Sequence, residues 1–257
     1  MQSPRPAAGA LRGTVPGVTT WTTPPPARQW ALFLDVDGTL LEFQPDPHAV
    51  RPDRELLDLL ARLAVALDGA VALVSGRPLS SLDAMFDPLR LPAAGLHGLE
   101  RRTALGRVEQ PSAAVPPAAR AALATLRDAY PGLLLEDKGA SVALHYRRAP
   151  SLEPVVREAA ERALASLGPA WQLLAGAFVY ELKPAGITKG TAVEAFLGEP
   201  PFAGRRPVYV GDDVTDLDGI AAAERLGGDG IAVGGRVAAR WRLPDPAATR
   251  RWLGLVL

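Results

Sequence analysis

Cysteine is absent from the 257-residue sequence, which excludes disulfide bonds, thiol nucleophiles and thiolate metal sites. Any metal ion must therefore bind through oxygen or imidazole. An excess of one charge is also lacking, because 28 Lys and Arg residues balance 28 Asp and Glu residues. A neutral chain gives no electrostatic reason to expect nucleic acid or an anionic membrane surface as a partner.

Long apolar runs are lacking as well. None approaches the roughly 20 residues that a membrane-spanning helix needs, and the N-terminus has no apolar segment of the secretory type. We therefore expect a cytoplasmic protein with no membrane partner. A monomer is expected by default. Residues 1–28 are rich in proline and predict a poorly ordered tail.

Short apolar runs and helical patterns alternate in the first and last parts of the chain. Buried strands are predicted at Trp30–Leu34, Ala70–Val74, Ala93–His97, Val208–Val210 and Ile231–Val233, and helices at 52–67 and about 246–256. This order indicates the α/β class, with a Rossmann-like parallel sheet and helices on both faces. Ligands of such sheets bind beyond the carboxyl ends of the strands, where the polar motifs of this sequence fall.

The middle third has a different pattern. Helices are predicted at about 116–130 and 152–167, with strands at 133–137, 140–147, 171–174 and 177–182. The second strand alternates, with Val142, Leu144 and Tyr146 on one face and Ser141, Ala143 and His145 on the other. We predict an α+β domain over 104–183, inserted between two core parts at 29–103 and 184–257.

The first polar motif, Asp35-Val36-Asp37-Gly38-Thr39, directly follows a predicted strand. Two carboxylates on one side of a strand end can divide the work of phosphoryl transfer, one as nucleophile and the other as proton shuttle. Thr39 adds a hydroxyl. An Asp-Gly pair is also ordinary turn chemistry, and the short motif alone leaves both interpretations open.

Further polar groups follow other predicted strands. Asp212 and Asp213, with Asp216, supply carboxylates; Asp35, Asp212 and the main-chain carbonyl of Asp37 could together hold Mg²⁺. Asp also favours the first turn of a helix, which would account for one or two of these residues. Ser75 is either a phosphate ligand or a turn residue, and Lys189, at a predicted helix start, is either an anion ligand or a surface lysine.

Taken together, the Asp-x-Asp-Gly-Thr motif, Ser75, Lys189 and Gly211-Asp212-Asp213 resemble the haloacid dehalogenase (HAD) superfamily. The resemblance implies a HAD core with an inserted cap domain over the active site. It implies Asp35 as nucleophile, Asp37 as general acid and base, and Lys189 as a catalytic phosphate ligand. Thr39 and Ser75-Gly76-Arg77 would contact the substrate, and Asp212 would bind magnesium.

Longer segments are similar to the trehalose-6-phosphate phosphatases. They are Gly95–Glu100, Glu136–Ser141, Glu181–Pro184 with Lys189-Gly190, and Gly211–Asp216. By this resemblance, Glu136, Lys138 and Glu181 should bind glucose hydroxyls, and His97 and Glu100 should line the mouth of the site. Lys183 departs from the family, which often has Arg there. The substrate would be a phosphorylated disaccharide, hydrolysed through an aspartyl phosphate as the last step of trehalose biosynthesis.

Other functions stay open at this point. Glu136 and Lys138 share one face of a strand and offer the donors and acceptors that sugar hydroxyls need, but they could also form an exposed salt bridge. A HAD phosphatase acting on sucrose 6-phosphate or mannosyl-3-phosphoglycerate, a phosphomutase, and a catalytically silent sugar-phosphate sensor are the alternatives. Phosphate release from a panel of esters would distinguish them.

Overall fold

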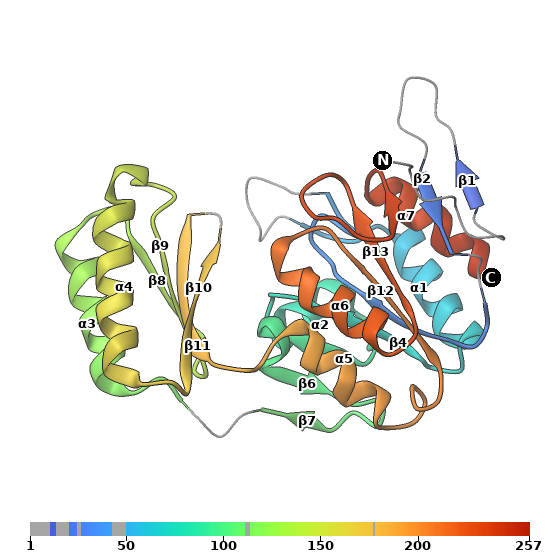
Figure 1. Ribbon diagram of the computed structural model, residues 1–257, viewed down its shortest axis with the longest axis horizontal. Coiled ribbons are helices and arrows are strands. Elements are labelled where there is room, and N and C mark those ends of the chain that lie inside the picture. Colours follow the sequence, from blue (N-terminus) through green and yellow to red (C-terminus); the bar gives the residue numbers. More distant parts are fainter. Residues whose placement is uncertain (1–10, 14–20, 25–26, 43–49, 111–113, 177) are drawn as a thin grey trace, which may run out of the picture. The chain divides into compact units, whose positions relative to one another are not determined.

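The computed structural model describes residues 11–13, 21–24, 27–42, 50–110, 114–176 and 178–257. Contacts divide the chain into two compact units (Figure 1): a core unit of Met1–Glu109 and Ile187–Leu257, and an inserted unit of Gln110–Gly186. The boundaries predicted at 104 and 183 fall a few residues before these two junctions. No described helix has the length and apolar character needed to cross a bilayer.

The core unit is built on a ten-stranded sheet whose centre is parallel. Its parallel strands lie in the order β14 (Trp241–Leu243), β13 (Asp229–Val233), β12 (Arg206–Gly211), β3 (Trp30–Leu34), β4 (Val71–Val74) and β5 (Ala93–Gly95). The residues of β3, β4 and β13 are all buried, as their continuous apolar runs predict. The predicted parallel α/β sheet is therefore confirmed.

Helices cover the two faces of this sheet. They are α1 (Arg54–Ala66), α2 (Leu79–Phe86), α5 (Lys189–Leu197), α6 (Leu217–Arg225) and α7 (Pro246–Leu253). Successive side chains of β3 point to opposite faces. Phe33 packs against Phe196 of α5 with 6.0 Å between ring centroids, whereas Trp30 packs against Trp252 of α7 at 5.6 Å. This alternation places Asp35, two residues after Phe33, on the α5 side of the sheet.

The edges of the core sheet are antiparallel and were not predicted. β6 (Glu100–Arg102) and β7 (Val108–Glu109) extend one edge, and β2 (Trp21–Thr23) and β1 (Leu11–Gly13) extend the other. The last two strands differ from the poorly ordered tail expected over residues 1–28. β2 pairs with β14 and β1 pairs with β2, contacts that a proline-rich composition does not reveal. The rest of that segment lies largely outside the described residues.

The inserted unit is an antiparallel sheet covered by two helices (Figure 1). Its strands lie in the order β10 (Trp171–Gly176), β11 (Val179–Pro184), β9 (Val142–His145) and β8 (Leu134–Asp137), and its helices are α3 (Pro117–Ala129) and α4 (Glu153–Leu167). Val142, Leu144 and Tyr146 are buried in its apolar core, as their alternation predicts. The opposite face is not uniformly open, since Ser141 and Ala143 are also buried.

Short 3-10 helices complete the description: η2 (Leu96–Gly98), η3 (Pro150–Leu152), η4 (Val214–Asp216) and η5 (Gly254–Val256). η2 directly follows β5, and η4 follows β12 after Asp212 and Asp213. They shape the edge of the sheet where the sequence predicts the site.

Candidate active site

The predicted polar motifs meet at the carboxyl ends of three neighbouring strands. Asp35 follows β3, Ser75 follows β4 and Asp212 follows β12, and β3 lies between the other two. The main chain fixes this junction, because Asp35 N–H donates to the carbonyl of Val210 at 3.0 Å. Carboxylate oxygens of Asp35, Asp212 and Asp216 lie within 4.8 Å of one another.

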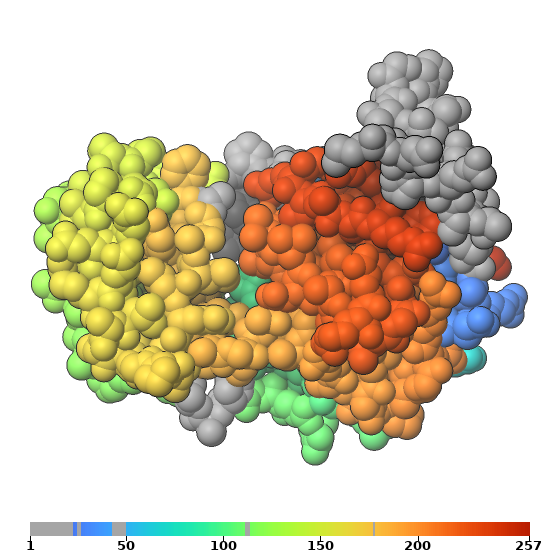
Figure 2. All heavy atoms as spheres, viewed as in Figure 1, coloured from blue at the N-terminus to red at the C-terminus, as the bar shows by residue number. Residues whose placement is uncertain are grey.

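These three carboxylates are buried: Asp35 and Asp212 are each 4% exposed and Asp216 is 0% exposed. The space-filling view shows residues after Ile187, in orange and red, forming much of the visible surface of the core unit (Figure 2). Burial of three like charges is costly unless cations compensate them. The neighbouring basic groups therefore decide what the site can do.

Lys189 supplies one of those cations. It is the first residue of α5, whose N-cap Thr188 accepts hydrogen bonds from the N–H groups of Gly190 and Thr191. The Lys189 ammonium donates to Asp35 Oδ1 at 2.7 Å and to Asp216 Oδ1 at 2.6 Å. Burial alone would lower the pKa of Lys189, but the two carboxylates outweigh it and raise that pKa. The lysine is therefore a permanent cation beside Asp35.

Asp216, which the sequence indicated only as an additional carboxylate, holds the site together. Its Oδ1 accepts from Lys189 and from the Tyr209 hydroxyl at 2.7 Å. Its Oδ2 accepts from the main-chain N–H groups of Asp212 at 3.1 Å and Asp213 at 2.9 Å. Four donors thus occupy its two oxygens, which makes Asp216 a support for Lys189 and Asp212. Tyr209 escaped the sequence analysis because it reads as one more apolar residue of a buried strand.

The geometry fits a divalent cation. Desolvation, followed by the charge of Asp216, raises the pKa of Asp35 well above its ordinary value. Desolvation and the charges of Asp216 and Asp213 raise the pKa of Asp212 to about 6. The cluster therefore carries more negative charge than its neighbours offset. Closely spaced carboxylate oxygens with such an excess suit a hard cation such as Mg²⁺.

Asp37 and Thr39 also lie in this region. The guanidinium of Arg77 binds both carboxylate oxygens of Asp37, with Nε to Oδ2 and Nη2 to Oδ1 each at 2.6 Å. The Thr39 hydroxyl donates to Asp212 Oδ1 at 3.4 Å. The structure thus places an ion pair at Asp37 that spacing alone could not reveal.

The remaining predicted residues of the core unit have structural contacts. Ser75 Oγ accepts from Arg77 N–H at 3.1 Å. Gly76 lies against His97, because a Cβ at position 76 would come within 2.7 Å of the imidazole ring. Glu100 Oε2 accepts from the N–H of Leu79, the first residue of α2. Glu100, expected at the mouth of the site, therefore stabilises the start of a helix.

Arg236 is a further basic residue at the carboxylate cluster. Its Nη1 lies 3.4 Å from Asp212 Oδ2 and 3.6 Å from Asp213 Oδ1. The side chain is half exposed, so both ion pairs are accessible to solvent. No sequence motif indicated this residue, because it follows Gly234-Gly235 in a loop after β13 and its partners are more than twenty residues earlier.

The sugar-binding residues predicted in the inserted unit form a cluster of their own. Lys138 Nζ lies 3.6 Å from Glu136 Oε2 and 3.5 Å from Glu181 Oε2. Ser141 donates to Glu181 at 2.5 Å, and His145 Nε2 lies 3.0 Å from Glu136 Oε2. The hydrogen bond from His145 is the main cause of a lowered pKa at Glu136. Two carboxylates and an ammonium in this arrangement offer both acceptors and donors to hydroxyl groups.

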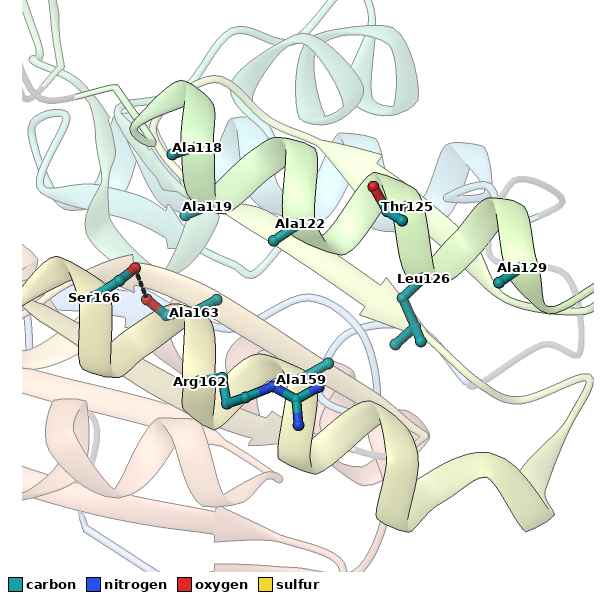
Figure 3. Close-up of a pocket in the computed structure, with 10 residues that line it drawn as sticks. All are labelled: Ala118, Ala119, Ala122, Thr125, Leu126, Ala129, Ala159, Arg162, Ala163 and Ser166. Atoms are coloured by element: carbon teal, nitrogen blue, oxygen red, sulfur yellow. Dashed lines mark hydrogen bonds between the residues drawn. The ribbon is translucent and has the colours of Figure 1, made fainter.

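A separate cavity of about 440 Å³ lies between α3 and α4 of the inserted unit (Figure 3). Its lining is mainly alanine, with Thr125, Leu126, Arg162 and Ser166. None of the predicted site residues lines it. It has no acid or nucleophile arranged for catalysis, so the cavity does not compete with the carboxylate cluster as the active site.

Comparison with known proteins agrees with this geometry. A family model described as trehalose-phosphatase matches residues 33–233. The chain is 46% identical over 228 residues to a probable trehalose-phosphate phosphatase of Sinorhizobium fredii, covering 88% of this chain and 86% of the relative. It is 42% identical over 238 residues to the trehalose-6-phosphate phosphatase of Escherichia coli, covering 91% and 89%.

Two solved structures have the same fold. The C-terminal domain of the C. albicans trehalose-6-phosphate phosphatase matches with a TM-score of 0.75 and 21% identity, covering 89% of this chain and 92% of that one. A trehalose-6-phosphate phosphatase related protein matches with a TM-score of 0.70 and 24% identity, covering 88% and 96%. Fold, site and relatives agree, and the chain belongs to the trehalose-phosphatase family.

Proposed function

We propose that this protein hydrolyses trehalose 6-phosphate to trehalose and inorganic phosphate, with Mg²⁺ as cofactor. The observation that carries the proposal is the juxtaposition of Asp35 with Lys189 and with Asp212 at adjoining strand ends. The relatives at 42% and 46% identity support the choice of substrate. The predicted monomeric state and cytoplasmic location stay predictions.

Asp35 is the proposed nucleophile. Lys189 contacts its Oδ1, and within the described residues no hydrogen bond reaches Oδ2, which is the oxygen available for attack. Oδ2 forms a bond to phosphorus as the bond from phosphorus to the sugar oxygen breaks, and Asp37 gives its proton to that oxygen. In the second step a water oxygen attacks phosphorus, its proton passes to Asp37, and the aspartyl phosphate breaks.

The cation would be held by Asp35 and Asp212, with the main-chain carbonyl of Asp37 as the third predicted protein ligand. When bound, it supplies positive charge that offsets the repulsion between the phosphate and the Asp35 carboxylate. Lys189, through its contact with Asp35 Oδ1, neutralises part of the same charge. Thr39 and Ser75 provide hydroxyls at the rim of the phosphate site.

The inserted unit is the proposed cap, and its Glu136, Lys138 and Glu181 cluster is the proposed sugar subsite. A site that pairs hydroxyl groups discriminates strongly against ligands that lack them, because its own polar groups are then left unpaired. This explains how one core could be adapted to a disaccharide phosphate. The contribution of these residues should appear in KM for the sugar ester.

Phosphate release from a panel of esters tests the proposal. The panel contains trehalose 6-phosphate, sucrose 6-phosphate, mannosyl-3-phosphoglycerate and p-nitrophenyl phosphate, each with Mg²⁺ and with a chelator. We expect trehalose 6-phosphate to give the highest kcat/KM, and the chelator to abolish turnover. A preference for another sugar ester, or isomerisation without phosphate release, would overturn the assignment.

Two variants test the proposed nucleophile and the proposed sugar subsite separately. Asp35→Asn should abolish turnover while the far-ultraviolet circular dichroism is kept. Glu136→Ala should raise KM for trehalose 6-phosphate and leave p-nitrophenyl phosphate hydrolysis nearly unchanged. Glu158→Ala, which removes an exposed ion pair with Arg162 in α4, is the matched control in the inserted unit. Equal losses on both esters in Glu136→Ala would contradict sugar recognition there.

A further inference from the structure

The contact between Arg77 and Asp37 bears on how the proposed general acid and base is controlled. Nε and Nη2 of the guanidinium each lie 2.6 Å from a different oxygen of the carboxylate. The Arg77 side chain is 13% exposed and that of Asp37 is 25% exposed. A bidentate, charge-assisted pair of this kind engages both oxygens at once and fixes the orientation of the Asp37 side chain.

The main chain fixes the point from which Arg77 reaches Asp37. Its N–H donates to Ser75 Oγ at 3.1 Å, and its carbonyl accepts from Leu96 N–H at 3.0 Å. Position 95 allows only glycine at this spot, because a Cβ there would come within 2.8 Å of the Arg77 carbonyl oxygen. The guanidinium therefore extends from a main-chain segment anchored to the ends of β4 and β5.

We propose that Arg77 is a positioning residue that orients the Asp37 side chain as the base for the second half-reaction. The inference rests on the proposed function, since it assumes the aspartyl phosphate on Asp35. In that step a water oxygen bonds to phosphorus, its proton passes to Asp37, and the bond from phosphorus to Asp35 breaks. An Asp37 side chain held in a fixed orientation is what this step requires.

The first half-reaction makes a different demand, because Asp37 must give a proton from one oxygen to the leaving sugar oxygen. The bidentate contact has to open on at least one side for this transfer, whereas an ester whose leaving group needs no protonation does not use Asp37 in this step. With such an ester, loss of Arg77 should therefore harm dephosphorylation more than phosphorylation. A simple phosphate ligand, the role that the resemblance implies for Arg77, would instead weaken the binding of every ester and of inorganic phosphate.

Trapping of the phosphoenzyme separates these roles. The probe is radiolabelled p-nitrophenyl phosphate with Mg²⁺, quenched in acid during turnover, because its leaving group needs no protonation. The variants are Arg77→Gln and Arg77→Lys, with Asp37→Asn as the variant that lacks the base. Arg205→Gln is the matched control, since it removes another arginine ion pair of the core unit, to Asp68 at 2.7 Å.

We expect labelled protein to accumulate in Arg77→Gln and in Asp37→Asn but not in Arg205→Gln. Dephosphorylation should be slowed by roughly 10- to 100-fold in Arg77→Gln, the scale of a misplaced catalytic group. The inhibition constant for inorganic phosphate should change little. Arg77→Lys keeps the charge with fewer donors and should accumulate less label; it carries the test alone if Arg77→Gln fails to fold.

Unlabelled Arg77 variants with a raised inhibition constant for phosphate would assign Arg77 to phosphate binding and overturn the inference. Variants with unchanged kcat and no label would overturn it as well. Failure of the proposed function has a different signature: no label would be found on any protein, including Asp37→Asn, or the label would survive replacement of Asp35.

Discussion

The Ser141 hydroxyl, just before β9, donates a 2.5 Å hydrogen bond to Oε1 of Glu181 within β11, forty positions later in the sequence. Both side chains are buried, with Ser141 0% exposed and Glu181 5% exposed. The contact leaves Glu181 Oε2 facing Lys138 at 3.5 Å. Ser141 therefore orients a carboxylate of the proposed sugar subsite.

Removal of that hydroxyl should affect sugar recognition specifically. In Ser141→Ala we expect KM for trehalose 6-phosphate to rise by roughly 10- to 150-fold, the equivalent of the ~1.5–3 kcal/mol that a hydrogen bond to a charged group contributes. Hydrolysis of p-nitrophenyl phosphate should stay close to the starting value. Ser166→Ala, whose hydroxyl donates to the carbonyl of Ala163 within the same helix, is the control. Parallel losses on both esters would show a general defect instead.

Gly211 is predicted to be intolerant of any side chain. A Cβ at this position would lie 2.3 Å from Cγ of Asp216, the residue that supports Lys189 and Asp212. Gly211→Ala must therefore displace Asp216, and we expect kcat to fall by roughly 100-fold, as for other misplaced catalytic constellations. Gly254→Ala, where a Cβ meets open space, should leave kcat unchanged. A fully active Gly211→Ala would show that Asp216 does not order the site.

The carboxylate cluster predicts a metal-dependent stability. Mg²⁺ should raise Tm, because an ion that binds only the folded state stabilises it by mass action. In the folded, metal-free protein the pKa of Asp212 is raised to about 6, above its ordinary value in the unfolded chain. The ionised Asp212 carboxylate therefore destabilises the metal-free fold above about pH 6, and this cost decreases as the pH falls from there toward the ordinary pKa. Protons should likewise compete with Mg²⁺ below about pH 6.

Differential scanning fluorimetry of Asp212→Asn tests this relation. The variant removes one of the mutually repelling charges, so its metal-free Tm should be equal to or higher than that of the starting protein. Its Mg²⁺-induced shift should be lost. Asp218→Asn, at a carboxylate outside the cluster in the first turn of α6, should keep the full shift. An undiminished shift in Asp212→Asn would place the cation elsewhere.

Asp53 gives a pH-dependent stability that is independent of the active site. It is the N-cap of α1, and its Oδ1 accepts from Leu56 N–H at 2.8 Å while Oδ2 binds Arg250 at 2.5 Å. The hydrogen bond from Leu56, and then that from Arg250, lower the pKa of Asp53. A lowered pKa in the folded state means stabilisation above the unfolded pKa that is lost as the pH falls through the folded value.

Asp53→Ala should therefore cost about 1 kcal/mol in the free energy of unfolding at pH 7, the usual cost of a lost N-cap. The difference from the starting protein should shrink below about pH 4, where Asp is protonated. Urea unfolding at both pH values measures it. Asp53→Asn keeps a capping side chain and should lose less, and Asp58→Ala on the exposed side of α1 should lose little. A cost that does not change with pH would exclude the ionic contribution.

The elements that the sequence predicted well are those with a local signal. The apolar run Trp30–Leu34 indicates a buried strand, and the apolar stripe in 52–67 indicates a helix with one buried face. The resemblance to a known family identified the polar motifs. β6, β7 and β14 are two or three residues long, too short for any periodicity to appear. Their formation depends on the sheet edge that they join.

Side-chain partners were harder to predict because they depend on contacts between distant parts of the chain. Arg77 pairs with Asp37 across forty positions, and Glu100 reaches back to Leu79 across twenty-one. The Tyr209 side chain is buried like that of a core residue, but its hydroxyl donates a hydrogen bond to Asp216. Residue type and spacing indicate which groups can react, whereas the fold decides which neighbour each of them meets.

The bond between Lys189 and Asp35 joins residues 154 positions apart, and everything between them, including the inserted unit, is synthesised in the interval. A chain emerging from the ribosome therefore carries the proposed nucleophile long before the ammonium that contacts it. Until α5 has left the exit tunnel, Lys189 cannot reach Asp35. We therefore expect enzymatic competence to arise late in biosynthesis, and chains that end before α5 to be inert.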